Sequence, residues 1–97
     1  MWSLNDALTL YRDILAPLAQ EHGFSAALYG SVLRNGTGND LDVFMVPQSA
    51  DANADSLLEA LSDYMKAVAG PEPGDWNRRV TVVTTHSRQR IDIQFLC

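Results

Sequence analysis

The sequence predicts an α+β fold, in which a small mixed sheet of about four strands carries two main helices on one face. Apolar residues recur at spacings of three and four in two long stretches, Ser3–His22 and Ala54–Ala69, as they do along the buried side of a helix. Short apolar or alternating runs follow each stretch, and turn residues separate these runs. The predicted order of elements is therefore α-β-β-α-β-β.

The composition is that of an ordinary folded protein with one domain. Its 97 residues are 46% hydrophobic and 20% charged, which suits a single core built from residues 1–97. The 12 acidic residues outnumber the 7 basic ones, so extended binding of nucleic acid through many phosphate contacts is not expected. The lone cysteine, Cys97, cannot form an internal disulfide, and no apolar run has membrane-spanning length, which together indicate the cytoplasm.

The first helix is predicted to begin at a capping box. Ser3 is placed to accept hydrogen bonds from the first free amides, and Asp6 lies favourably near the positive end of the helix dipole. Pro17 is expected to kink this helix or to end it early. The pair His22-Gly23 should close it, since glycine tolerates a positive φ.

Two strands joined by a turn are expected next. The apolar run Phe24–Tyr29 is too short for a helix and predicts a buried strand that ends at Gly30. Ser31–Arg34 has room for one helical turn, and the glycines and asparagines of Asn35–Asn39 predict a loop. Asp40–Val46 is the second strand.

The second half of the chain is expected to contain a helix and a hairpin. The helix spans Ala54–Ala69 and is stopped by Gly70-Pro71, and the composition of Pro71–Asp75 predicts a loop. The β-branched run Val80–Thr85 predicts a third strand, which a tight turn connects to a fourth, Arg90–Leu96.

Three aspartates in two of the predicted strands are candidate metal ligands. Residues at i and i+2 of a strand share a face, so Asp40 and Asp42 project together, away from the core. Neighbouring carboxylates repel unless a cation lies between them, and such oxygen ligands suit Mg²⁺ or Mn²⁺. Asp92, the isolated acid of the fourth strand, becomes a third ligand if the strands are neighbours in suitable register. The alternative is that all three are solvated acids on a turn and an edge strand.

A phosphate site is predicted beside these acids. Gly30 lets a backbone approach a phosphate closely, Ser31 offers a hydroxyl, and the amides of the following turn point at an anion. Together with two metal ions held by three carboxylates, this combination supports in-line phosphoryl transfer from a nucleoside triphosphate. Arg88 and Arg90 are further candidates for contact with a triphosphate tail, the alternative being solvated arginines on a strand.

These residues resemble the minimal nucleotidyltransferase domain of the DNA polymerase β superfamily. The signature of that family is an apolar residue, then Gly and Gly or Ser, a spacer, acid-apolar-acid-apolar, and a third acid on a later strand. The corresponding residues here are Tyr29, Gly30, Ser31, Asp40, Leu41, Asp42, Val43 and Asp92, and Arg34 falls where many members carry an arginine. The eight residues between Ser31 and Asp40 make the spacer shorter than is usual in the family.

The resemblance implies a nucleotidyltransferase-like fold over residues 1–97 and a role for six of the matching residues. Gly30, Ser31 and Arg34 would bind ATP or another nucleoside triphosphate. Asp40 and Asp42 would hold both Mg²⁺ ions, and Asp92 would assist the attacking hydroxyl as a metal ligand and base.

Two functions are compatible with the sequence. The first is a Mg²⁺-dependent nucleotidyltransferase that moves AMP from ATP onto a partner macromolecule, similar to antitoxin-like proteins that adenylylate a partner toxin. A protein acceptor, acting in trans, fits the acidic chain better than RNA. The second is a nucleotidyltransferase-fold protein that has lost activity through its short spacer and serves as a binding module or inhibitor of a partner protein.

Overall fold

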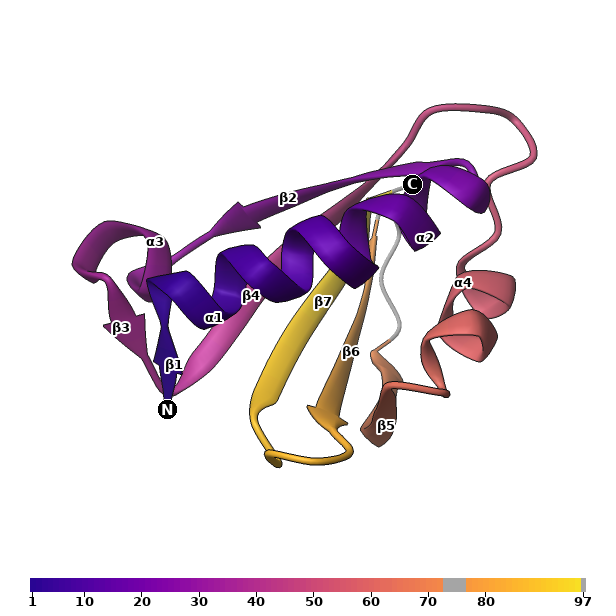
Figure 1. Ribbon diagram of the computed structural model, residues 1–97. Coiled ribbons are helices and arrows are strands. Elements are labelled where there is room, and N and C mark those ends of the chain that lie inside the picture. The colour runs from indigo at the N-terminus through magenta and orange to yellow at the C-terminus, as the bar shows by residue number, and fades with distance from the viewer. Residues whose placement is uncertain (73–76, 97) are drawn as a thin grey trace.

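The computed structural model, which describes residues 1–72 and 77–96, has two layers: a mixed sheet and helices packed on one of its faces (Figure 1). This confirms the predicted α+β class. The elements are β1 (Trp2–Ser3), α1 (Leu4–Leu10), the π-helical turn η1 (Tyr11–Leu15), α2 (Ala16–Glu21), β2 (Phe24–Tyr29), α3 (Ser31–Asn35), β3 (Thr37–Gly38), β4 (Asp40–Pro47), α4 (Ala54–Leu61), β5 (Met65–Glu72), β6 (Asn77–Thr84) and β7 (Arg90–Leu96).

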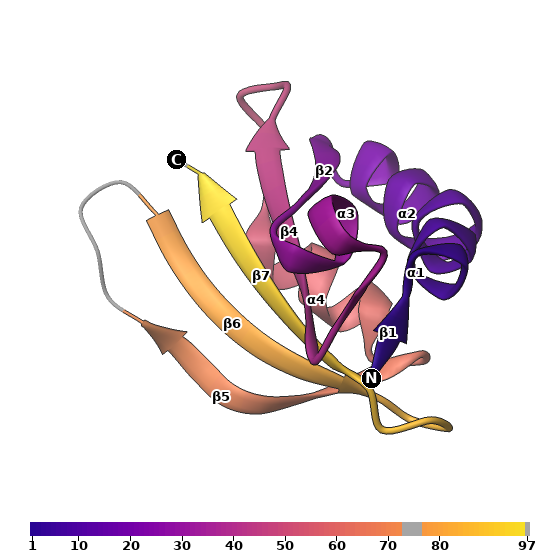
Figure 2. The ribbon, with the colours of Figure 1, turned by 90° about the vertical axis from the view of Figure 1, so that its left-hand side faces the viewer.

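The main sheet has five strands in the order β2-β4-β7-β6-β5, so the prediction of about four strands is one too low. Its central pair, β4 and β7, is parallel, and the remaining pairs are antiparallel. Figure 2 looks along the layers and shows the four strands β4, β7, β6 and β5 side by side. Because β4 and β7 are parallel, residues near the start of each strand lie at the same end of the sheet.

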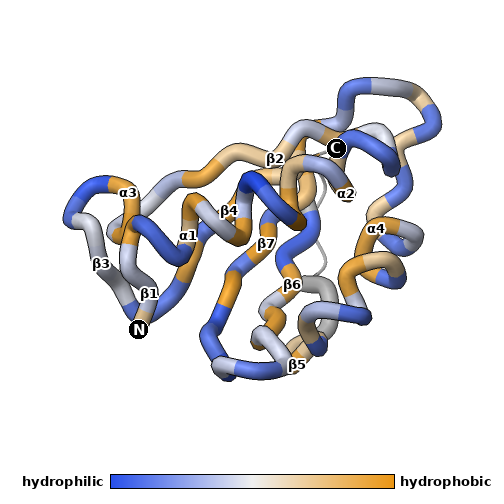
Figure 3. Tube along the Cα trace, in the orientation of Figure 1, coloured by the Kyte–Doolittle hydropathy of each residue, from blue (hydrophilic) through white to orange (hydrophobic). Residues whose placement is uncertain are grey.

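The core lies between the sheet and the helices. It forms because every second residue of the central strands is apolar and faces the helices. Orange and blue residues alternate along β7 in Figure 3, and the same alternation of buried and half-buried residues runs through β4. The apolar side chains that face the helices from three central strands are Leu41, Val43, Met45, Val80, Val82, Ile91, Ile93 and Phe95. The opposite face of these strands, here called the open face, therefore carries their polar residues.

The first helical segment runs from Leu4 to Glu21 and is capped at His22, where its end was predicted. Pro17 does not end it early, because a π-helical turn at Tyr11–Leu15 precedes the proline. The Ala16 amide donates to the Tyr11 carbonyl, five residues back, within this wider turn. Proline lacks an amide and crowds the carbonyl four residues before it, and the wider turn relieves both problems without ending the helix. The predicted cap is confirmed, since the Ser3 side chain accepts a hydrogen bond from the Asp6 amide (3.1 Å).

The predicted second helix, Ala54–Ala69, is wrong in its second half. The helix ends at Leu61, and Met65–Glu72 forms the edge strand β5 along β6. Met65 and Val68 continue the helical spacing of the leucines before them, yet Val68 is 58% exposed. Pairing with β6 outweighs this local pattern, and the proline of Gly70-Pro71 is tolerated because the strand lies at the sheet edge.

The short strands β1 and β3 were also missed. Trp2 pairs with Gly38 and Ser3 with Thr37, so β3 lies within the predicted loop Asn35–Asn39, and β1 directly precedes the first helix. The remaining predictions for β2, α3, β4, β6 and β7 agree with the structure within a few residues. Residues 73–75 of the predicted loop Pro71–Asp75, and Cys97, lie outside the described residues.

Candidate functional site

The three predicted aspartates come together on the open face of the sheet. Strands β4 and β7 pair so that Asp42 lies directly beside Asp92, and Asp40 lies beside Arg90. Asp40 and Asp42 are two residues apart on one strand and therefore share that face. The three carboxylates form what we call the acid cluster.

The charge of Asp42 is disfavoured within this cluster. Partial burial is the main cause of its raised pKa, and repulsion by Asp92 and then Asp40 adds to the increase. The positive charges of Arg79 and Arg34 act in the opposite direction. A carboxylate in this position gains from any cation that approaches the cluster.

Two side chains hold the remaining acids in place. Thr81 on β6 is 6% exposed, and its hydroxyl donates to Asp92 Oδ1 over 2.8 Å. Arg90 Nε lies 3.7 Å from Asp40 Oδ1 and 3.8 Å from Asp92 Oδ1, so one guanidinium faces both carboxylates. The contact with Thr81 fixes the orientation of Asp92, while Arg90 partly neutralises the cluster.

The predicted phosphate turn adjoins the cluster through Gly30. This residue has a φ of 89°, and a Cβ at this position would collide with Asp42 Oδ2, so glycine is required on both grounds. The charge of Arg34, in the last turn of α3, offsets a small part of the rise in the pKa of Asp42. The Ser31 hydroxyl lies against Gly38 of β3, where an added Cβ would come within 2.7 Å of its oxygen.

Two aromatic residues lie beside the cluster, and neither was predicted to bind or react, although Tyr29 matches the apolar position of the family signature. Tyr29 pairs with Asp42 across β2 and β4, and its ring stacks on that of Phe44 with centroids 3.9 Å apart. Burial, followed by the negative charge of Asp42, raises the pKa of the Tyr29 hydroxyl. Strand alternation places Phe44 on the same face as Asp42, and this was the available sequence signal for it.

The chemistry of the donors suits Mg²⁺, which binds carboxylate oxygens. As the side chains stand, however, no group of three or more His, Cys, Asp or Glu within residues 1–72 and 77–96 is arranged to hold a metal ion. The backbone register brings the donors together, while the conformers of the side chains leave Arg90 as the cation between Asp40 and Asp92.

Among the helices of the described ranges, none is both long and apolar enough to cross a membrane.

Comparisons with known proteins assign neither a family nor a function to the chain. No model of a known protein family matches the chain, and a search of curated proteins finds no significant match.

Proposed function

We propose that this chain is a Mg²⁺-dependent nucleotidyltransferase of the cytoplasm that transfers AMP from ATP to a partner protein. One observation carries the proposal: Asp42 and Asp92 are direct neighbours on parallel strands, with Asp40 on the same face and the Gly30 backbone against Asp42. Adjacent strands lie about 4.8 Å apart, a spacing at which two carboxylates can share one cation.

The three acids, one glycine and two arginines would have roles in this reaction. Asp40, Asp42 and Asp92 would hold Mg²⁺, which when bound neutralises charge on the triphosphate and favours deprotonation of the attacking hydroxyl. The Gly30 backbone would approach the triphosphate closely, and Arg34 and Arg79 would supply positive charge to it, as they do to Asp42. The acceptor oxygen would bond to the α-phosphorus while the bond to pyrophosphate breaks, and Asp92 would take the proton of the acceptor.

Two contacts prepare the site for a cation. Thr81 keeps one oxygen of Asp92 oriented, so less side-chain freedom is lost when a ligand binds. Arg90 compensates the charges of Asp40 and Asp92, and with a cation held by these acids its guanidinium would be available to pair with phosphate.

The acceptor is proposed to be a protein. The net charge of −5 opposes the approach of RNA, whose backbone is itself negative. The resemblance to nucleotidyltransferases that act as antitoxins points to adenylylation of a partner protein in trans. An additional domain for binding RNA is not required by this proposal.

A specific observation favours a second candidate function. Arg90 already pairs with two of the three acids, and the described side chains do not form a ready metal site. A chain with these features suits a nucleotidyltransferase-fold binding module that uses its acidic surface to occupy a basic groove on a partner protein.

Thermal unfolding with nucleotide separates the two candidates. At ten times its Kd, Mg²⁺-ATP should stabilise the native chain by about 1.4 kcal/mol, which raises the Tm by about 6–11 °C for a domain of this size. ATP with EDTA should give a much smaller shift, and Asp42→Asn should abolish the Mg²⁺-dependent part. An unchanged Tm at millimolar Mg²⁺-ATP would contradict nucleotidyl transfer and support the binding module.

Transfer itself is tested with ATP labelled at the α-phosphate and lysate from the protein's own source. The expected result is a labelled protein band that requires Mg²⁺ and disappears with Asp42→Asn. Label at the γ-phosphate should not be transferred, since pyrophosphate is the leaving group. Transfer of the γ-label, or transfer that survives Asp42→Asn, would contradict the proposed reaction.

A further inference from the structure

A cavity of about 500 Å³ lies on the helix side of the molecule, away from the open face. It is bounded by the first helix, by the turn between α4 and β5, and by the turn between β6 and β7. Its lining includes Leu10 and Ile14 from the helix, with Tyr64 from the first of the two turns. We call this cavity the helix-side groove.

The apolar part of the groove is open to a partner. Leu10 and Ile14 are half-buried, and Tyr64 remains 44% exposed although it is a large aromatic residue. Trp2, which also lines the groove, is nearly fully buried and fixed by a hydrogen bond from its Nε1 to the Arg90 carbonyl (2.7 Å). A row of apolar side chains on a rigid base is typical of a surface that packs against another molecule.

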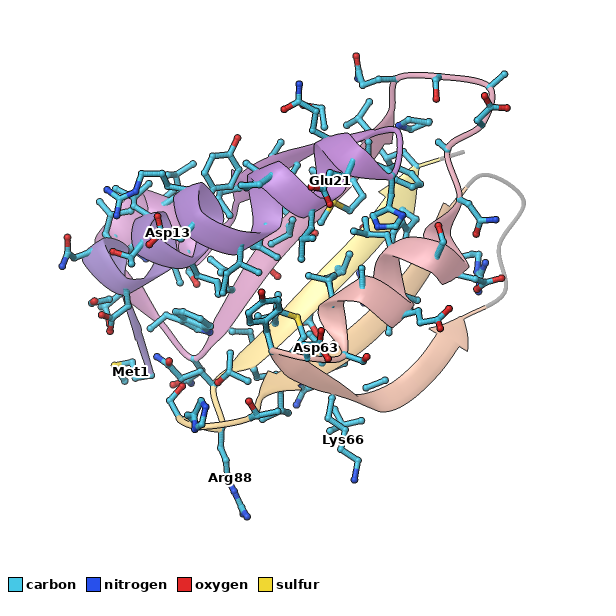
Figure 4. The ribbon with its side chains drawn as sticks, turned by 45° about the vertical axis from the view of Figure 1, so that its right-hand side comes forward. Met1, Asp13, Glu21, Asp63, Lys66 and Arg88 are labelled. Atoms are coloured by element: carbon cyan, nitrogen blue, oxygen red, sulfur yellow. The ribbon has the colours of Figure 1, made fainter. Side chains whose placement is uncertain are left out.

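The charge of the groove is negative on both walls. Asp6 and Asp13 line it from the first helix, seven residues and about two turns apart, and Asp63 lines it from the turn before β5. Figure 4 shows Asp13 and Asp63 on different elements, whereas Lys66 and Arg88 extend away from the body of the molecule. Among the described residues that line the groove there is no lysine or arginine.

The ion pair between Arg12 and Asp13 does not block the groove. Arg12 Nε donates to Asp13 Oδ1 over 2.9 Å, but both side chains are more than half exposed. An exposed pair of adjacent residues contributes little stability and exchanges readily for another cation. Asp13 is therefore accessible to a basic group of a partner.

We propose that the helix-side groove binds a basic amphipathic helix of a partner protein. The apolar face of such a helix would pack on Leu10, Ile14 and Tyr64. Lysines or arginines spaced two turns apart would match the spacing of Asp6 and Asp13 on the helix of this chain. Asp63 would pair with a basic residue on the other flank of the bound helix.

Charge complementarity distinguishes this occupant from the alternatives. A second copy of the chain would bring a net charge of −5 toward an acidic groove, and nucleic acids or anionic membranes would be repelled in the same way. None of the groove residues belongs to the acid cluster of the open face. Binding of a basic helix to the groove therefore does not depend on nucleotidyl transfer at the open face.

The probe for this proposal is a 14-residue amidated peptide of leucine and lysine, with leucines at helical spacing. Its titration into the labelled full chain, followed by amide NMR, should shift the signals of Leu10, Ile14, Tyr64 and His86 in a saturable way. The same peptide with glutamate in place of lysine should not bind. Fourteen residues form about four helical turns, and a concentration of about 1 mM is about a thousandfold above a micromolar Kd. Equal binding of both peptides, or no shift at about 1 mM of the lysine peptide, would overturn the proposal.

Matched variants separate the groove from general electrostatics. Asp6→Asn with Asp63→Asn should weaken the lysine peptide about three- to tenfold, the range expected for the loss of two exposed ion pairs. Asp51→Asn with Glu59→Gln removes the same charge from exposed sites outside the groove and should leave affinity within about twofold. The amide spectra of both variants show directly whether they are folded.

Three results would contradict the assignment. Equal weakening by the two double variants would mean that only the net charge attracts the peptide. Shifts centred on Asp42 and Asp92 would move the peptide to the open face. Concentration-dependent shifts of the groove signals in the free protein, with a dimer in sedimentation, would identify a second copy as the occupant.

Discussion

The acid cluster and the helix-side groove each contain three aspartates, but the acids are crowded in the cluster and separated in the groove, and the pKa shifts found in the two regions have opposite directions. In the cluster, Asp42 and Asp92 are adjacent on paired strands, and burial followed by repulsion raises the pKa of Asp42. In the groove, the exposed Asp13 accepts a hydrogen bond from Arg12, which lowers its pKa. Crowded acids require a compact cation between them, whereas separated acids beside apolar side chains suit an extended basic partner.

The largest difference between the two regions is expected in metal binding. Asp42→Asn should reduce Mg²⁺-dependent nucleotide affinity by at least about a hundredfold, since removal of groups that merely support metal ligands already costs 10- to 100-fold. Asp63→Asn in the groove should leave this affinity unchanged. Isothermal titration with Mg²⁺-ATP measures both, and equal losses would remove the distinction between the regions.

The same variant has a pH signature without metal. Because the folded pKa of Asp42 is raised above its usual 3.8, the native state retains a proton that the unfolded chain releases. Stability should therefore fall as pH rises from 3.8 through the raised pKa, and Asp42→Asn should remove this part of the slope. The folded pKa of Asp13 is instead lowered, so the charge of Asp13 contributes stability that is lost as pH falls through that value. Asp13→Asn should remove this contribution and its dependence on pH. Urea unfolding across this pH range tests both signs.

The next effect concerns the packing of the cluster. Gly30→Ala should destabilise the chain by about 2–5 kcal/mol, because a left-handed backbone and a collision with Asp42 add together. Gly36→Ala is the matched control, since φ is 78° there but no atom lies within 4 Å of the added Cβ. It should cost only about 1–2 kcal/mol in urea unfolding. Equal costs would mean that the Gly30 backbone is not confined by Asp42.

A smaller effect is expected when the hydrogen bond from Thr81 to Asp92 is removed. Thr81→Val keeps the shape of the side chain but removes the donor to Asp92 Oδ1, which should cost about 1.5 kcal/mol for a bond to a charged group. Mg²⁺-ATP affinity should fall about tenfold. Thr81→Ser should restore most of the affinity, which a loss of packing alone would not explain. An affinity unchanged in Thr81→Val would show that Asp92 needs no fixed orientation.

The smallest effect on stability is expected in the groove. Asp63→Asn should change the free energy of unfolding by less than about 0.5 kcal/mol, as is usual for an exposed residue. Its effect should appear only with the lysine peptide, as an affinity loss of about two- to threefold. A stability loss above about 1 kcal/mol would instead make Asp63 a structural residue.

The sequence predicted best those elements whose local pattern agrees with their final environment. The alternation in Asp40–Val46 and Arg90–Leu96 predicted that Asp40, Asp42 and Asp92 point away from the core. In the structure the two strands are hydrogen-bonded neighbours, so the three acids share one face of the sheet. The strand Met65–Glu72 was missed because its residues also continue a helical pattern, and only pairing with β6 decides between the two.

Contacts within the site depended on register that the sequence does not contain. Thr81 reaches Asp92 because β6 and β7 pair these two positions directly. Arg90 reaches two acids because β7 runs parallel to β4, with Arg90 opposite Asp40. Trp2 lines the groove because its indole is tied to the Arg90 carbonyl, 88 residues later in the chain.

The central claim is that the open-face acids, and not those of the groove, form the divalent cation site. Mn²⁺ can replace Mg²⁺ on carboxylate ligands and broadens the amide signals of nearby residues, so a titration of the labelled chain locates the ion directly. The account predicts saturable broadening centred on Asp40, Asp42 and Asp92, abolished by Asp42→Asn. Broadening centred on Asp6, Asp13 and Asp63, or broadening that survives Asp42→Asn, would contradict it.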